Sequence, residues 1–168
     1  MLDFQLLPWR MEYAPDIAPL ANNPAIFANL RDVLPQPYTL EDARDFIGSA
    51  LTAGNGTLLR AIVIDGRAAG SIALYQGQDI YRQCAEIGYW LGQPYWGQGV
   101  MSRAVAAMCA QGFAQLPIRR IYAQPFARNA ASRRVLEKNG FVLEGIMRQG
   151  AIKLGETLDW CMYAKLRA

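Results

Sequence analysis

The sequence predicts an α+β fold in which a mixed β-sheet is flanked by helices. Two strand-like segments, 57–64 and 67–75, meet at Asp65-Gly66, which is a strong hairpin signal. Further along, a strand, a helix and a second strand follow one another between residues 83 and 124, which implies a parallel pair with a right-handed crossover. No linker, repeat or low-complexity segment divides residues 1–168, so we expect a single domain.

The N-terminal region is expected to be mainly helical after a first strand. Thr39 and Asp42 have the spacing of a capping box, which marks the start of the longest helix in this region. Asn22-Asn23-Pro24 separates two shorter helices, because proline cannot continue a preceding helix. The elements predicted here are a first strand over 2–10 and 11–13, with some interruption at Pro8, and helices at 15–22, 24–32 and 39–53.

A glycine-rich loop, residues 92–99, lies between a predicted strand at 86–91 and a predicted helix at 100–115. Gly97 and Gly99 lack a Cβ atom, so the backbone there can turn sharply and approach a ligand closely. The loop leads into a helix N-terminus, where unpaired N–H groups and the helix dipole favour phosphate oxygens. It lacks the third glycine of a dinucleotide fingerprint and the Gly-Lys of a P-loop. We therefore expect a phosphorylated cofactor here, and a plain strand-to-helix turn is the alternative.

The C-terminal third alternates helices and strands. Val105, Met108 and Cys109 recur at helical spacing, so they are expected to face the sheet rather than a ligand. Asn129 has the character of a helix cap, and Gly140 that of a helix stop. The elements predicted after the 100–115 helix are a strand at 118–124, a helix at 129–139 and strands at 141–149 and 157–166.

The composition excludes several kinds of catalysis. The 168 residues are 52% hydrophobic and 18% charged, which is ordinary for a globular protein. Histidine is absent, so Ser–His–Asp and Cys–His catalysis are excluded and no metal site is expected. The three cysteines match neither a disulfide framework nor a zinc pattern, and we expect free thiols. With no membrane-spanning run and no signal-like N-terminus, a cytoplasmic protein is expected.

The net charge of +3 arises from a basic excess in the second half of the chain, which contains the glycine-rich loop. An anionic cofactor would be attracted there. Nucleic-acid binding is a weaker interpretation, because only the pairs Arg119-Arg120 and Arg133-Arg134 stand out and no long basic run is present.

Two ordered motifs carry a resemblance to a known family. The first is the strand Glu86–Leu91 followed by Trp96-Gly97-Gln98-Gly99, and the second is Asn129-Ala130-Ala131-Ser132 followed by Arg133–Phe141. They resemble the GNAT acetyltransferases, and more narrowly the RimJ/RimL-type branch, over roughly residues 8–166. The resemblance implies the GNAT fold, with a mixed sheet of roughly six or seven strands flanked by helices. It also implies acetyl-coenzyme A (acetyl-CoA) as cosubstrate and no metal.

The resemblance also implies where the cofactor binds. In the family, the strand matching 86–91 diverges from the strand matching 118–124, pantetheine pairs with the first strand, and the loop holds the pyrophosphate. Trp96 stands where broader family members carry Arg or Gln, so we expect backbone amides to hold the phosphates. The implied cofactor-binding residues are Tyr89, Trp90, Leu91, Trp96, Gly97, Gln98, Gly99, Val100, Met101, Ser102 and Asn129.

The mechanism implied is direct attack of an amine on the thioester in a ternary complex. Ser132 matches a serine proposed in relatives to protonate the leaving thiolate, and a small packing residue is the alternative. Glu86 is the best-placed candidate for a general base, although a solvent-facing strand end or an ion pair is the simpler explanation of this residue. Tyr89 and Tyr122 are weaker candidates. Orientation of the two substrates could supply most of the rate and leave no essential base.

The acceptor is expected to be a primary amine of a protein N-terminus, an amino acid or a small molecule. In the family the segments matching 22–38 and 148–156 shape its site, and a homodimer is common in the branch. The candidate residues for contacts with the acceptor are Trp9, Phe27, Asp32, Tyr38, Glu41, Asp42 and Trp90. A non-catalytic CoA-binding regulatory or interaction module is the alternative function, and a nucleic-acid or ribosome-binding module is a third.

Overall fold

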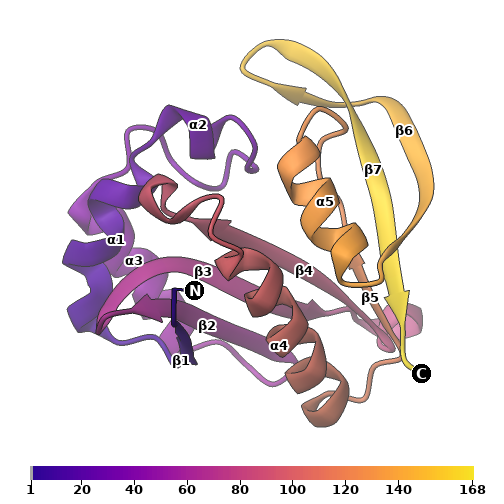
Figure 1. Cartoon of the computed structure of the whole chain (residues 1–168), viewed down its shortest axis with the longest axis horizontal. Coiled ribbons are helices and arrows are strands. Elements are labelled where there is room, and N and C mark those ends of the chain that lie inside the picture. Colours follow the sequence, from indigo (N-terminus) through magenta and orange to yellow (C-terminus); the bar gives the residue numbers. More distant parts are fainter. Residues whose placement is uncertain (1) are drawn as a thin grey trace.

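The computed structural model describes residues 2–168, which form a seven-stranded sheet with helices on both faces (Figure 1). The strand order is β1-β2-β3-β4-β5-β7-β6, and every neighbouring pair is antiparallel except β4 and β5. The predicted mixed sheet is therefore confirmed. The strands are β1 Gln5–Leu7, β2 Thr57–Ile64, β3 Arg67–Gln76, β4 Cys84–Leu91, β5 Arg120–Ala123, β6 Val142–Lys153 and β7 Glu156–Leu166.

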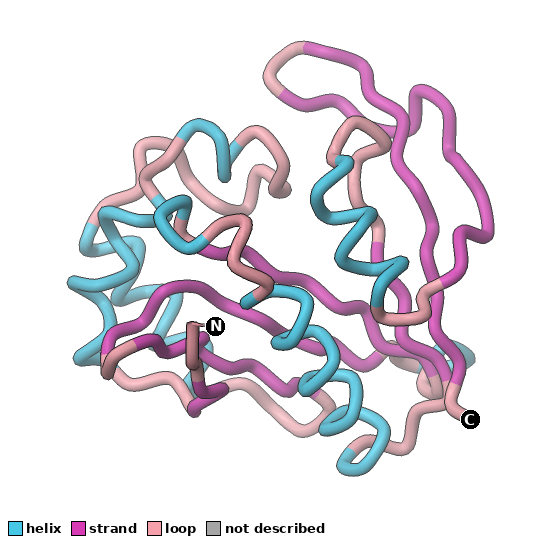
Figure 2. The backbone as a smooth tube through the Cα atoms, viewed as in Figure 1, coloured by secondary structure: helices cyan, strands magenta, loops and turns pink. Residues whose placement is uncertain are grey.

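The longer helices form one layer on each face of the sheet (Figure 2). Helices α1 and α3 pack on one face of β2 and β3, and α4 packs on the other. Helix α5 lies on the same side as α4, with Leu136 in the same apolar cluster. The α-helices are α1 Ala14–Ala21, α2 Pro24–Phe27, α3 Leu40–Leu51, α4 Val100–Gln115 and α5 Ala130–Lys138. No helix among residues 2–168 is long and apolar enough to cross a membrane.

Strand β2 explains why two separate cores form. Ala61 and Val63 point into the cluster with α1 and α3, whereas Ile62 and Ile64 point into the cluster with α4. Successive side chains of a strand face opposite sides, so the uninterrupted apolar run 61–64 is buried on both faces. The centre of the sheet is thereby fixed between two helix layers.

The N-terminal expectations were partly wrong. Only Gln5–Leu7 forms a strand, because Pro8 lacks the N–H that would continue the pairing with β2. Met11–Tyr13 forms a 3₁₀ turn that leads into α1, not a strand. The helix expected over 24–32 stops after one turn at Phe27, and the chain beyond it contains Asn29 and Asp32, which are weak helix formers.

The final hairpin is longer than predicted. Strand β6 continues to Lys153 instead of ending at Gln149, and Leu154-Gly155 closes a two-residue turn in which both residues have positive φ. Gln149 has φ +54° and lies where the register with β7 shifts, so Gln149-Gly150 is part of a β-bulge. The sequence was misread here because a glycine inside a strand can mark either a bulge or a strand end.

Several local signals were confirmed. Thr39 and Asp42 make both hydrogen bonds of the capping box, and Asp65-Gly66 forms the hairpin turn with positive φ at both residues. The side chain of Asn129 accepts the N–H of Ser132 at the start of α5. The three cysteines are free thiols.

Candidate active site

The parallel pairing of β4 and β5 is short. It joins Cys84 to Arg120, Ala85 to Ile121 and Glu86 to Tyr122. Strand β4 then runs on to Leu91, while β5 ends at Ala123. Pro125, which has no N–H, follows closely and cannot extend the ladder. Within residues 2–168, the last five residues of β4 therefore pair only with β3, and their other edge is available to a ligand.

The glycine-rich loop connects this unpaired edge to α4. Gly97 and Gly99 both have φ +72°, a conformation that L side chains rarely adopt. A Cβ atom at either glycine would meet open space, with no heavy atom within 4 Å. Among residues 2–168, no hydrogen-bond acceptor pairs with the N–H groups of residues 97–102, and the first helical bond runs from Arg103 N–H to Gly99. The loop thus presents a row of free amides around an open space.

Two side chains hold the loop in shape. The indole N–H of Trp96 donates to the carbonyl of Leu91 at 2.7 Å, and the side chain of Gln98 donates to the carbonyl of Pro94 at 3.1 Å. These contacts tie the loop to the end of β4. The indole N–H of Trp96 and the Nε2 atom of Gln98 are thus used within the protein.

Several other predicted cofactor-binding residues have side chains packed in the apolar clusters, so only their backbone groups could contact a cofactor. Trp90 packs against the cluster formed with α1 and α3, and Leu91 and Val100 are buried in the cluster on the opposite face. Met101 is partly buried against that second cluster. A ligand at this edge would meet their N–H and C=O groups, not their side chains.

Ser132 and Tyr89 come together from different elements. The Ser132 hydroxyl lies 2.8 Å from the phenol oxygen of Tyr89, so α5 is joined to β4 beyond the point where β5 has diverged. Burial raises the pKa of Tyr89 to about 12, and the hydrogen bond with Ser132 lowers it in part. The phenol therefore stays protonated at neutral pH. The Ser132–Tyr89 pair is a source of O–H donors, and Tyr89 is poorly suited to act as a base.

Asn139 is a site residue that the sequence did not reveal. Its side-chain N–H₂ donates to the carbonyl of Ser102 at 3.0 Å and to the carbonyl of Val135 at 2.8 Å. The last turn of α5 is thereby tied to the first turn of α4, next to the free amides. Its position just before Gly140 indicated only a helix end, so no sequence signal distinguished this role.

Glu86 lies on the opposite face of β4 from Tyr89, because the two residues are an odd number of positions apart. Its carboxylate forms an ion pair with Arg31, from the segment between α2 and α3. The Arg31 guanidinium also donates to Gln124 at 2.8 Å, just beyond β5. Arg31 thus spans the point where β4 and β5 diverge. The sequence analysis named Glu86 but missed Arg31 and Gln124.

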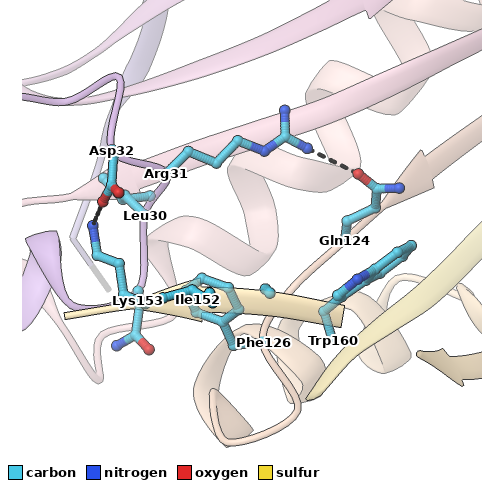
Figure 3. A pocket seen from close by; sticks show the side chains of 10 residues that line it. Leu30, Arg31, Asp32, Gln124, Phe126, Ile152, Lys153 and Trp160 are labelled. Carbon is cyan, nitrogen blue, oxygen red and sulfur yellow. Dashed lines mark hydrogen bonds and ion pairs between the residues drawn. The ribbon is translucent and has the colours of Figure 1, made fainter. Parts of the chain in front are cut away.

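A pocket of about 380 Å³ is lined in part by Arg31 of this ion pair (Figure 3). Its walls come from the segment after α2, the residues after β5, the end of β6, and β7. The lining residues are Asn29, Leu30, Arg31, Asp32, Gln124, Phe126, Ala151, Ile152, Lys153 and Trp160. The pocket therefore lies between the two segments, 22–38 and 148–156, that were expected to shape an acceptor site.

Most of the acceptor candidates named from the sequence lie elsewhere. Trp9 and Tyr38 are buried in the core with α1 and α3, and Trp90 packs against that core. Asp42 is occupied by the capping box. Asp32 does line the pocket, and the aromatic side chains there are Phe126 and Trp160, which the sequence analysis did not single out.

Comparisons with known proteins agree with this geometry. A model of the acetyltransferase (GNAT) domain family matches residues 3–142. The putative ribosomal N-acetyltransferase YdaF of Bacillus subtilis (strain 168) is 31% identical over 106 residues, covering 63% of this chain and 57% of the relative. The ribosomal-protein-serine acetyltransferase of Escherichia coli (strain K12) is 34% identical over 82 residues, covering 49% of this chain and 46% of the relative. The chain thus spans about half the length of the curated relatives it matches.

The fold agrees over almost the whole chain. RimL, a ribosomal L7/L12 α-N-protein acetyltransferase solved in complex with coenzyme A, superposes with a TM-score of 0.86 at 27% identity. The superposition covers 97% of this chain and 93% of that one. Given the family match, the diverging strands and the glycine-rich loop, the chain belongs to the GNAT acetyltransferase family, and the relatives it resembles there are of the RimJ/RimL type.

Proposed function

We propose that the protein is an N-acetyltransferase that moves an acetyl group from acetyl-CoA to a primary amine by direct attack in a ternary complex. The observation that carries this proposal is the divergence of β4 and β5 after the Glu86–Tyr122 pair, with the free edge of β4 leading into a glycine-rich loop and a helix N-terminus. An unpaired strand edge suits the amide groups of pantetheine, and free helix-terminal amides suit a pyrophosphate.

The donor is proposed to bind on the side of the sheet covered by α4 and α5. The amides of residues 97–102 would hold the pyrophosphate, with no arginine or lysine side chain required in the loop. Tyr89, Trp90 and Leu91 would pair with pantetheine through their backbone. The Oδ1 atom of Asn129 is already used to cap α5, which leaves its side-chain N–H₂ for the cofactor.

The chemical step needs a proton donor for the leaving group and a proton acceptor for the amine. The amine nitrogen bonds to the thioester carbon, the C–S bond breaks, and the thiolate takes a proton. Ser132, hydrogen-bonded to the protonated Tyr89, is the proposed donor to the sulfur. Glu86, on the opposite face of β4, is the proposed acceptor of the amine proton, directly or through water. The two roles are thus assigned to opposite sides of one strand.

The pocket beside Arg31 is the proposed acceptor site, because it adjoins the ion pair of Glu86 at the divergence of the strands. The names of relatives favour a protein N-terminus as acceptor: RimL is described as an α-N-protein acetyltransferase, and the Escherichia coli relative as a ribosomal-protein-serine acetyltransferase. Because these relatives are named for ribosomal proteins, we also propose a cytoplasmic location. We further propose that residues 1–168 act as a single domain.

The function is tested by thiol release from acetyl-CoA against a panel of amino acids, polyamines, aminoglycosides and N-terminal peptides. We expect one class, the peptides or the amino acids, to stimulate release well above the rate without acceptor. Donor binding in calorimetry with no acetylated acceptor would favour the non-catalytic module. Absence of donor binding would refute the assignment of the glycine-rich loop.

Gly99→Val is expected to reduce acetyl-CoA affinity by at least about a hundredfold. The side chain would enter the open space around the free amides, and valine is strained at φ +72°. Gly66→Val is the matched control, since Gly66 also has positive φ and open space but lies in the β2–β3 turn. Both variants should lose stability, and only Gly99→Val should lose affinity in calorimetry. Equal affinities would contradict the loop assignment.

Ser132→Ala is expected to lower kcat by about a hundredfold while the acetyl-CoA affinity stays the same, because a proton donor to the thiolate is lost. The backbone N–H that Asn129 caps is retained, so α5 should still form. Ser49→Ala, on the exposed side of α3, is the control for a helix serine and should leave kcat unchanged. An unchanged kcat for Ser132→Ala when chemistry is rate-limiting would make Ser132 a packing residue.

Glu86→Gln is expected to lower kcat by about a hundredfold, since an amide of the same shape cannot take the amine proton. Asp16→Asn is a matched control, because Asp16 is also a half-buried carboxylate paired with an exposed arginine, Arg67, but lies away from the pocket. Steady-state rates at saturating donor decide the question. If the two variants lose the same small amount of activity, Glu86 serves only in the ion pair and substrate orientation supplies the rate.

A further inference from the structure

Lys153 is a buried cation in the wall of the proposed acceptor pocket. Its side chain is only 1% exposed, although it lies near the tip of the β6–β7 hairpin. The ammonium group is 2.7 Å from Asp32 Oδ1 and 3.4 Å from the centre of the Phe27 ring. A buried ammonium is costly unless an anion or other acceptors compensate it. Among residues 2–168, Asp32 is the one hydrogen-bond acceptor that Lys153 contacts.

Separating this ion pair would cost Lys153 much more free energy than Asp32, because the two side chains differ in exposure to water. The Asp32 side chain is 76% exposed, so water can replace Lys153 around it at little cost. Lys153, in contrast, is removed from water and needs an anion at all times. An ammonium also has three N–H donors, of which Asp32 takes one. An incoming anion could therefore displace Asp32, because the anion would then bind the Lys153 ammonium and water would bind the Asp32 carboxylate.

The pocket has two distinct ends (Figure 3). Lys153 and Asp32 lie at one end, and Gln124 lies at the other, where Arg31 reaches it and Glu86. Apolar side chains of Phe126 and Ile152 lie between the ends. At the Gln124 end the charge of Arg31 is balanced by the half-buried Glu86. At the other end, within the part of the chain that the structure describes, the buried Lys153 is balanced only by the exposed carboxylate of Asp32.

We propose that Lys153 determines acceptor specificity by binding a carboxylate carried by the acceptor amine, with Asp32 as the internal anion that this carboxylate displaces. The inference rests on the proposed function, because it assigns a substrate class to the same site. The amine lies at the Gln124 end, near Glu86, and the carboxylate lies at the Lys153 end. The acceptor is therefore an amine with a carboxylate, supplied either by the α-carboxylate of an amino acid or by an acidic side chain near a peptide N-terminus.

The experiment uses acceptor pairs that differ only in this carboxylate. The peptide amides Ser-Asp-Ala and Ser-Asn-Ala test a side-chain source, and alanine and alaninamide test an α-carboxylate. We expect the acidic member of at least one pair to have a kcat/KM about tenfold higher in the wild type. The pair that shows the preference identifies the source. Equal values within both pairs would overturn the proposal.

Two variants should then shift the acceptor KM in opposite directions. Lys153→Met keeps an unbranched chain of similar length on the Phe27 ring and should remove the preference by raising KM for the acidic acceptor. Asp32→Asn removes the competing anion and should lower KM for the same acceptor. If the ion pair only fastened the hairpin to the segment after α2, both variants would raise KM, and that result would refute the proposal.

Arg128→Met is the matched control for a purely structural bridge. Arg128 also joins these segments, since it contacts Glu156 at 3.1 Å and the carbonyl of Ala28 at 2.8 Å, but it does not line the pocket. The preference for the acidic acceptor should survive in this variant. Loss of the preference in Arg128→Met to the same extent as in Lys153→Met would overturn the proposal.

A binding measurement separates failure of this inference from failure of the proposed function. Calorimetry with the products N-acetyl-Ser-Asp-Ala amide and N-acetyl-Ser-Asn-Ala amide needs no turnover. Preferential binding of the acidic product that is lost in Lys153→Met supports the carboxylate site even if no acceptor is acetylated, in which case acetyl transfer is refuted. Acetylation without any acidic preference, in turnover and in binding, refutes the carboxylate site alone.

Discussion

The candidate site depends on one constraint: β4 and β5 can pair in parallel for only three residues. The crossover through α4 brings the two strands together, the pairing ends at Tyr122, and Pro125 has no N–H with which to resume it. Beyond Glu86, the backbone of β4 has a partner on one side only among residues 2–168. The Tyr89 hydroxyl is hydrogen-bonded to Ser132 of α5 past the point where β4 and β5 diverge. The glycine-rich loop, the helix N-terminus and the ion pair of Glu86 are all arranged around this divergence.

Alternation along β4 separates the proposed chemistry into two sides. Tyr89 and the buried Ile87 point toward α4 and α5, where the donor is proposed to bind. Glu86 points the other way, toward Arg31 and the pocket. A strand between two substrates can thus offer a proton donor to one and a proton acceptor to the other without moving. The proposal therefore requires no large conformational change for the chemical step.

The sequence predicted the elements and the parallel pairing of β4 and β5, and missed individual contacts between side chains that lie far apart in the chain. Periodicity, turn residues and caps identified the strands, the glycine-rich loop and the Asn129 cap, because each signal lies within a few residues. The contacts of Arg31 with Glu86 and of Lys153 with Asp32 join residues that are 55 and 121 positions apart. A single sequence does not reveal such pairs, since a charged residue on a loop is usually solvated. The bulge at Gln149 was missed because the glycine that follows it, Gly150, could mark either a bulge or the end of the strand.

The same bulge has a consequence for how the protein behaves in concentrated solution. Strands β1 and β6 are the two edges of the sheet, and the edge of a sheet is a template on which another chain can add a strand. Strand β1 is three residues long, which is too short to be an effective template. Strand β6 is long and carries exposed apolar side chains such as Val142 and Ile146, but the bulge breaks its regular hydrogen-bonding pattern. The strand that carries Ile152 and Lys153 to the pocket is therefore, because of this irregularity, also a poorer template for edge-to-edge pairing.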